Sequence, residues 1–157
     1  MGVYTSIPAL GFLCLHKYSL QQLFDGLERA DGSQATLPDH TKLVLALALE
    51  KMQLFQRTNV SWIKDDELIP SACCKSRTKC IKEQAVMARV ECLDRKVDVS
   101  FLLESWAKVG EGKWKGRLCA FCEEAAKRPY DVARKKAWGM LPSFFGLVPW
   151  EELTDAE

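Results

Sequence analysis

Histidine is scarce in this sequence of 157 residues, and motifs typical of catalysis are missing. The two histidines are His16, on an expected helix, and His40, next to the cap-like Asp39; both positions are more typical of surface residues than of catalytic bases. No serine or cysteine lies in a nucleophile elbow, and no glycine-rich loop resembles a phosphate cradle. The sequence therefore predicts that the protein is not an enzyme and has no small-molecule substrate.

Long hydrophobic runs and a strong net charge are missing as well. No stretch approaches the ~20 apolar residues that span a bilayer, and the apolar start 1–15 lacks the basic region and cleavage site of a signal peptide. Lys and Arg number 22 against 21 Asp and Glu, so the chain as a whole has no electrostatic attraction for nucleic acid or an anionic membrane. We therefore expect a cytoplasmic or nuclear protein without a membrane partner, and nucleic acid is not the favoured partner.

The composition, with 48% hydrophobic and 27% charged residues, is typical of a globular protein. Apolar residues recur mainly at helical spacing, whereas alternating strand patterns are nearly absent. The predicted fold is all-α, an irregular helical domain with a candidate cysteine-ligated zinc ion as a staple. Helices are expected over 9–18, 19–30 with Ser19 as N-cap, from Pro38 onward, over 76–93, and over 118–136.

The connections between these helices carry further predictions. Residues 58–62 are expected to be extended, and 97–101 is the one strand candidate. Pro129 is expected to bend or split the helix over 118–136. The change in composition near 64–70 predicts two segments, a helical one over 1–62 and a second over 63–157 that contains the cysteine cluster and the aromatic tail.

The last part of the chain is rich in large apolar side chains. Pro142 and Pro149 each suit the first turn of a short helix, and Gly146 permits a turn between them. Burying each large side chain stabilises a fold by about 1.5–3 kcal/mol, so we expect core packing rather than an exposed anchor for a partner. The residues concerned are Trp138, Leu141, Phe144, Phe145, Leu147 and Trp150.

Seven cysteines are present, and five of them form a suggestive pattern. Cys119-Ala120-Phe121-Cys122 is a Cys-x-x-Cys knuckle that places two thiolates on one metal ion with little strain. Cys80 together with Cys73 or Cys74 would complete the tetrahedral set that zinc requires, and Cys74 is favoured. The predicted metal ligands are Cys74, Cys80, Cys119 and Cys122.

Two other interpretations of these cysteines remain open. A free cysteine often packs as a small buried hydrophobe, and in that case these residues would belong to the core. Thiol redox chemistry at Cys119 and Cys122 is the less favoured interpretation, because the strand-helix context of a thioredoxin motif is missing. Cys14 and Cys92 fall on apolar helical faces and are expected in the core.

Two charged runs have a functional and a plainer interpretation. Asp65-Asp66-Glu67 contains neighbouring carboxylates, but its loop setting favours a solvated surface over acid-base chemistry. The run Arg134-Lys135-Lys136, with the lysines around Trp114, has the composition of a nucleic-acid patch. The nearby glutamates favour a solvated helix face instead.

The C-terminal segment reads Leu118-Cys119-Ala120-Phe121-Cys122, then Ala133 to Trp138, then Leu141-Pro142-Ser143-Phe144-Phe145-Gly146-Leu147-Val148-Pro149-Trp150-Glu151-Glu152-Leu153. It resembles the tail of the BTB/POZ-domain-like proteins of mushroom-forming fungi, which carry a Leu-Cys-x-x-Cys helix, a basic stretch ending in Trp, and a Leu-Pro-x-x-Phe-Gly-Leu ending. The segment from Ala9 to Tyr18 is similar to the helix that closes a BTB domain.

The resemblance implies protein–protein interaction through helices, with the chain corresponding to the C-terminal half of such a protein. The BTB core itself is not expected here, so BTB dimerisation and cullin recruitment are not implied. The first hypothesis is thus a non-enzymatic protein–protein interaction module, an adaptor or scaffold. A nucleic-acid-associated protein supported by zinc is the alternative, and a thiol-redox protein ranks last.

Overall fold

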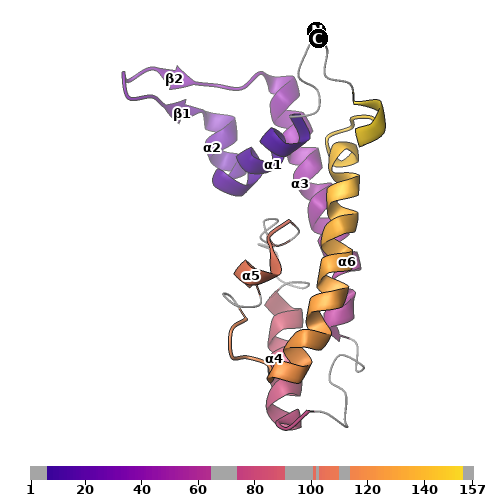
Figure 1. The fold of residues 1–157 in the computed structure, drawn as a ribbon. Helices are drawn as coiled ribbons and strands as arrows, with labels where there is room; N and C mark the ends of the chain where they lie inside the picture. The colour runs from indigo at the N-terminus through magenta and orange to yellow at the C-terminus, as the bar shows by residue number, and fades with distance from the viewer. Residues whose placement is uncertain (1–6, 65–73, 91–100, 102, 110–113, 154–157) are drawn as a thin grey trace. The chain divides into compact units, whose positions relative to one another are not determined.

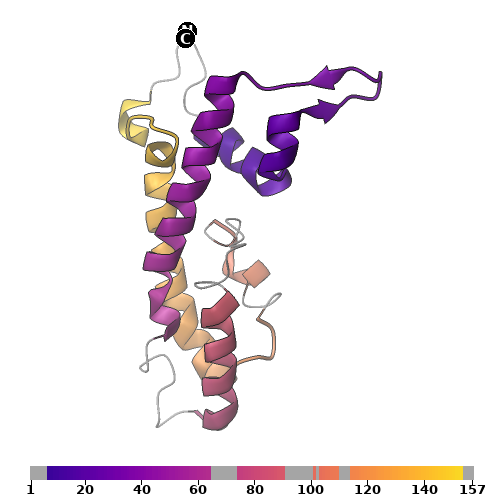
Figure 2. The same ribbon diagram turned by 180° about the vertical axis from the view of Figure 1, so that it is seen from behind.

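A computed structural model of the chain describes residues 7–64, 74–90, 101, 103–109 and 114–153. These residues are mostly helical, as the sequence predicts (Figures 1 and 2). A two-stranded antiparallel sheet pairs β1, Leu27–Glu28, with β2, Gln34–Ala35. The α-helices are α1 Ile7–Lys17, α2 Leu20–Asp25, α3 Asp39–Asn59, α4 Arg77–Ala88, α5 Trp106–Lys108 and α6 Ala120–Phe144. The 3-10 helices whose bounds fall within the described residues include η1 Ser61–Lys64 and η6 Trp150–Glu152.

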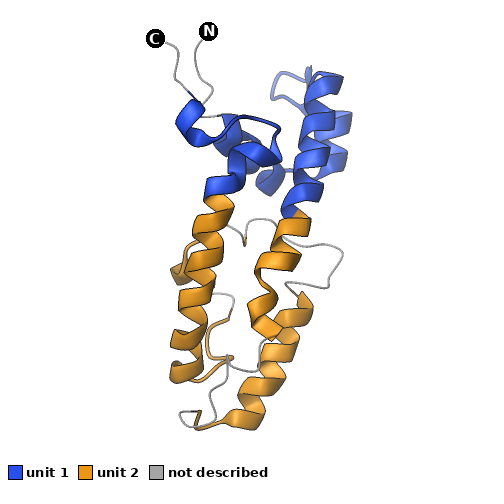
Figure 3. Ribbon diagram, turned by 90° about the vertical axis from the view of Figure 1, so that its right-hand side faces the viewer, with its two compact units in different colours: residues 1–52, 139–157 blue, residues 53–138 orange. Residues whose placement is uncertain are grey.

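The chain divides into two compact units (Figure 3). Unit 1 combines residues 1–52 with 139–157, and unit 2 contains 53–138. The ends of the chain thus belong to one unit, and its middle belongs to the other. Helices α3 and α6 each contribute residues to both units, since the divisions fall at Met52 and Gly139.

The N-terminal helices of unit 1 follow the predicted capping, but the second helix is shorter than expected. Ser19 forms a capping box with Gln22: its Oγ accepts from the Gln22 N–H, and Gln22 Oε1 accepts from the Ser19 N–H. The helix ends at Asp25 because Gly26 has φ +93°, and the prediction of a helix to residue 30 was wrong. A hairpin follows instead, whose turn is held by Asp31 Oδ1 accepting hydrogen bonds from Ser33.

Helix α3 begins next to Pro38, as expected, and continues further than predicted. Residues 58–62 are not extended, because α3 runs to Asn59 and η1 follows at Ser61. The Thr58 hydroxyl donates to backbone carbonyls of the preceding turn, and the Val60 N–H donates to the Gln56 carbonyl. These bonds satisfy groups that an extended segment would leave for a partner strand.

An aromatic cluster forms the centre of unit 2. Tyr130 of α6 is surrounded by Phe101, Trp106 and Trp114, with ring centroids 5.2–6.4 Å from that of Tyr130. The Tyr130 hydroxyl lies 2.8 Å from the carbonyl oxygen of Phe101 and 2.9 Å from that of Glu104. Burial of the rings and of this hydroxyl ties α6 to the segment around α5.

The prolines of α6 do not divide it as predicted. The helix continues through Pro129 and also includes Pro142, which therefore does not start a separate helix. The Pro142 carbonyl accepts the N–H groups of Phe145 and Leu147 at the helix end, where Gly146 has φ +72°. The turn at Gly146 and the short helix after Pro149 agree with the prediction.

The burial of the aromatic tail was predicted only in part. Leu141, Phe144 and Phe145 are buried, whereas Trp138 is 51% exposed. The expectation that Trp138 packs in the core was wrong, because it lies on the outer face of α6 next to buried Ala137. Leu147 and Trp150 are partly buried.

Several predictions fall outside the described residues: the acidic run 65–67, Cys73, Cys92, and positions 97–100 of the strand candidate. The last position of that candidate, Phe101, is described and is not in a strand. Among the described helices, none combines the length and the apolar composition needed to cross a membrane.

Candidate metal centre

Four cysteine side chains of unit 2 lie together at one place. The Sγ atoms of Cys74, Cys80, Cys119 and Cys122 are all within 4.8 Å of one another. They are the four residues that the sequence nominates as metal ligands. Cys80 and Cys122 are fully buried, and Cys74 and Cys119 are partly buried. The cluster therefore has a closed inner side and an outer side that solvent reaches.

The helices α4 and α6 bring the four sulfurs together. Cys74 precedes α4 and Cys80 lies in its first turns, while Cys119 precedes α6 and Cys122 lies in its first turn. The six-residue separation of Cys74 and Cys80 is longer than that of a common knuckle, but the turn at 75–76 before α4 lets both sulfurs face the same point. Figures 1 and 2 show α4 beside the first half of α6.

Polar contacts hold these two helices in register around the cluster. Lys79 Nζ donates to the Gly116 carbonyl at 3.0 Å, and Arg117 pairs with Glu83 at 2.9 Å. The Cys119 N–H donates to Cys80 Sγ at 3.3 Å. Such N–H···S contacts are typical of sulfur atoms that carry negative charge, because they stabilise the thiolate.

The four thiols differ in acidity. The hydrogen bond from the Cys122 backbone N–H lowers the pKa of Cys119 to about 7. Burial raises the pKa of Cys80, although the Cys119 N–H opposes this shift, and burial raises the pKa of Cys122 strongly. Cys80 and Cys122 are therefore poor nucleophiles, because both are buried and resist ionisation. A bound cation would stabilise their thiolate forms.

The spacing of the sulfurs suits a metal ion better than a disulfide. Cys74 Sγ and Cys119 Sγ are 3.8 Å apart, far longer than the S–S bond of about 2.05 Å, and all described cysteines are free thiols. A tetrahedral ion with metal–sulfur bonds of about 2.3 Å holds its sulfurs about 3.8 Å apart. The cluster could therefore hold a metal ion after small adjustments of its longer sulfur separations.

The other residues that the sequence analysis considered lie outside this cluster. His16 and His40 are exposed, and Cys14 is partly buried in unit 1 rather than fully in a core. Trp114 is buried in the aromatic cluster, so it cannot be part of an exposed basic and aromatic patch with its neighbouring lysines. Lys136 of the basic run donates to Asn59 Oδ1 at 2.7 Å.

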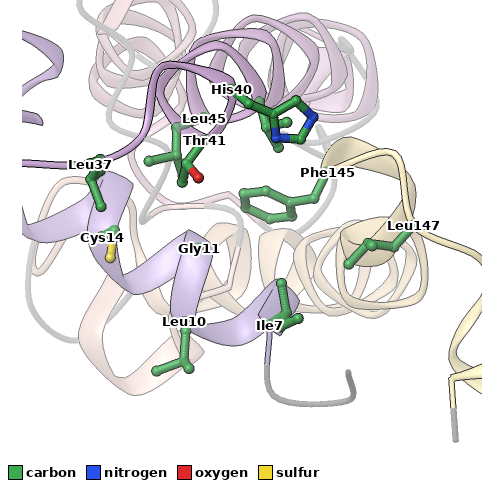
Figure 4. Close-up of a pocket in the computed structure, with 11 residues that line it drawn as sticks. Ile7, Leu10, Gly11, Cys14, Leu37, His40, Thr41, Leu45, Phe145 and Leu147 are labelled. Atoms are coloured by element: carbon green, nitrogen blue, oxygen red, sulfur yellow. The ribbon is translucent and has the colours of Figure 1, made fainter. Parts of the chain in front are cut away.

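Unit 1 contains an apolar pocket of about 440 Å³ that the sequence did not indicate (Figure 4). Its walls come from α1, from the start of α3 and from Phe145 and Leu147. Gly11 is the point of closest approach, because a Cβ there would lie 2.5 Å from the Phe145 ring. The spacing of Gly11 to Phe145 depends on long-range packing, for which the sequence carries no local signal.

A basic surface on α4 was also missed. Lys75, Lys79, Lys82 and Arg89 are all exposed, and their spacing of three, four and seven residues was a readable signal.

The chain was compared with protein-family models, with curated proteins and with solved structures, and none of them matches.

Proposed function

We propose that this chain is a non-enzymatic protein–protein interaction module, an adaptor or scaffold, in which one structural zinc ion staples unit 2. The observation that carries the proposal is the cluster of four sulfurs within 4.8 Å of one another. Four protein ligands complete the tetrahedral shell of zinc, so no position is left for a substrate or a catalytic water. A site of this kind stabilises a fold rather than a transition state.

The zinc ion would link two helices that are distant in the sequence. Cys74 and Cys80 belong to the α4 region, whereas Cys119 and Cys122 belong to the start of α6. Because such a site is not formed in the unfolded chain, the ion binds the folded state, and its binding free energy adds directly to folding. Unit 2 would thereby present a rigid surface to a partner.

Exposed apolar side chains of unit 1 support the interaction role. Ile7, Leu10 and Leu13 recur along α1 at helical spacing and are 39%, 55% and 54% exposed. The apolar pocket is lined by α1 and by Phe145, so it could accept a large apolar side chain from a partner. Contiguous exposed apolar surface is typical of interaction sites. The resemblance of the C-terminal segment to BTB/POZ-like proteins points in the same direction.

Metal analysis of the full chain tests the staple. Protein purified without chelator is expected to contain one zinc per chain, and a strong chelator is expected to remove it and to lower the melting temperature. Cys80→Ser should reduce the zinc content to near zero, and the matched variant Cys14→Ser should keep it. Seven free thiols, no metal and an unchanged melt in chelator would reject the staple.

A comparison of variants tests the interaction role separately. Leu10→Asp with Leu13→Asp places two charges on the exposed face of α1, and Gln21→Asp with Gln22→Glu adds the same charge at exposed positions of α2. Proteins retained from a mushroom-forming fungus by the wild type and by the α2 variant, but not by the α1 variant, would support the module. Equal retention by all three chains would reject it.

Thiol–disulfide exchange is a second candidate that one observation favours. The pKa of Cys119 is lowered to about 7, which is typical of the attacking cysteine of a redox pair. Zinc binding occupies the same sulfur, so the two functions exclude each other in one molecule. Catalysed reduction of a disulfide substrate by the metal-free chain, with a small dithiol as the reductant and loss of activity in Cys119→Ser or on addition of zinc, would favour the redox function; an inactive metal-free chain would reject it.

A further inference from the structure

Unit 2 carries an excess of positive charge that the net charge of the whole chain conceals. Residues 53–138 contain 18 Lys and Arg against 12 Asp and Glu, a net charge of +6. The remaining residues, those of unit 1, contain 4 Lys and Arg against 9 Asp and Glu, a net charge of −5. The near-neutral total of +1 therefore does not describe the electrostatic behaviour of either unit.

The positive charge is organised along one side of α4. Lys79 and Lys82 lie on the helix, Lys75 precedes it, and Arg89 follows its last residue. Helical spacing places Lys79, Lys82 and Arg89 on one side, Lys75 lies in the turn that leads into the helix, and each of the four is exposed. We call the four residues the α4 basic face. Its last residue, Arg89, lines a pocket together with Lys64 of η1, which adds a fifth cation at that end.

The α4 basic face is not neutralised by its own helix. Glu83 is the one acidic residue of α4, and it pairs with Arg117 at 2.9 Å. Lys79 Nζ donates to the Gly116 carbonyl, a neutral group that leaves the ammonium charge in place. The surface beside the metal centre therefore carries a row of cations spaced one or two helical turns apart.

The chemistry of this row favours nucleic acid over an acidic protein as its partner. Protein–protein interfaces are depleted in lysine and contain apolar or aromatic anchors at their centre, whereas the large apolar side chains along this side are two valines, Val86 and Val90, which are 39% and 42% exposed. Protein–nucleic acid interfaces are polar and rich in Lys and Arg that contact phosphates. We propose that the α4 basic face binds the phosphate backbone of nucleic acid, an activity beyond the protein-binding role.

The full chain, purified without chelator, is titrated into a fluorescein-labelled DNA duplex of about 20 base pairs at salt between about 50 and 200 mM. The test variant combines Lys75→Gln, Lys82→Gln and Arg89→Gln, and it spares Lys79 because of its bond to Gly116. The matched control combines Arg57→Gln, Lys108→Gln and Lys135→Gln, exposed positions of unit 2 on α3, α5 and α6. Both variants change the charge equally, and both are checked for zinc content and helical circular dichroism.

The wild type and the control should bind, with an affinity that falls as salt rises. The test variant should bind the duplex about tenfold more weakly, or worse, at about 100 mM salt. Each lost phosphate contact reduces the slope of log K against log salt by about 0.9, so the loss of three contacts should flatten the slope by between about 2 and 3. No binding by the wild type at low salt, or equal loss in the control, overturns the proposal. It is also overturned if polyglutamate of matched charge competes as well as unlabelled duplex, which would assign the face to an acidic protein.

Discussion

The sulfurs of Cys74 and Cys119 lie 3.8 Å apart although 45 positions separate the two residues in the sequence. Both are partly buried, whereas Cys80 and Cys122 are completely enclosed. Solvent and thiol reagents can thus reach two of the four thiols in the folded chain. The other two are open to a bound metal ion, or to a thiol reagent once the chain has unfolded. The first two predictions use this difference.

In the metal-free protein, iodoacetamide should modify Cys119 before the other three cysteines of the cluster. The hydrogen bond from the Cys122 N–H lowers the pKa of Cys119 to about 7, so about half of this thiol is ionised at neutral pH. Because the shift is downward, the rate should fall as the pH drops below about 7, while buried Cys80, whose pKa is raised, should stay slow. Peptide mapping by mass spectrometry measures the order, and fastest labelling at Cys80 would contradict it.

Zinc should protect all four cysteines, and acid should release the ion. Protons compete with zinc for thiolates, so the zinc content of the folded chain should fall as the pH is lowered. Labelling of Cys14, in unit 1, should be the same with and without zinc, which makes it the internal control. Protection of Cys14 to the same extent as Cys119 would mean that the metal acts through aggregation or general stabilisation.

Tyr130→Phe should lower the free energy of unfolding by about 1–3 kcal/mol. The Tyr130 hydroxyl is buried and lies within hydrogen-bonding distance of the Phe101 and Glu104 carbonyls, which the variant would leave without this donor. The aromatic ring remains, so the loss reports the hydroxyl and not the packing. Urea unfolding followed by circular dichroism gives the value, and Tyr18→Phe, at a partly buried position of unit 1, should change it by less than about 0.5 kcal/mol.

Gly11→Ala should destabilise unit 1 by about 1–3 kcal/mol, because the new Cβ would lie 2.5 Å from the Phe145 ring and force it out of its place. Gly139→Ala is the matched control within α6: nothing lies within 4 Å of its Cβ position, and alanine is the better helix former, so stability should rise by up to about 1 kcal/mol. Combining Gly11→Ala with Phe145→Leu should recover part of the loss. A Gly11→Ala protein as stable as the wild type would show that the ring adapts freely.

Local patterns predicted the helices and the pair Cys119 and Cys122, because capping and a Cys-x-x-Cys knuckle are properties of neighbouring residues. Cys74 and Cys80 were added because zinc takes four ligands, and the structure places them beside that pair. Ser19 acts through Gln22, three positions away, and Cys119 and Cys122 are brought together by one helical turn. The hairpin after Gly26 was missed because the apolar residues before it fit a helix equally well.

What the sequence could not predict depends on contacts between distant segments. Residues 139–157 belong to the same unit as 1–52, so the pocket between Gly11 and Phe145 has no local signature. Pro129 stays inside α6 because the neighbouring Ala126 and Tyr130 are buried in unit 2, and this burial offsets the hydrogen bond that proline cannot make. The charge of unit 2 likewise becomes visible only once its boundaries are known.

Replacing Trp114 by alanine should lower the free energy of unfolding much more than replacing Trp138. Trp114 is 4% exposed within the aromatic cluster, so Trp114→Ala should cost about 3–5 kcal/mol and unfold unit 2 or leave it marginal. Trp138 is 51% exposed, so Trp138→Ala should change the free energy of unfolding by less than about 1 kcal/mol. Denaturant unfolding of both variants measures the difference. If Trp138→Ala proved as damaging as Trp114→Ala, Trp138 would be a core residue, as the sequence alone suggested, and the outer face of α6 would have to be covered by other parts of the protein.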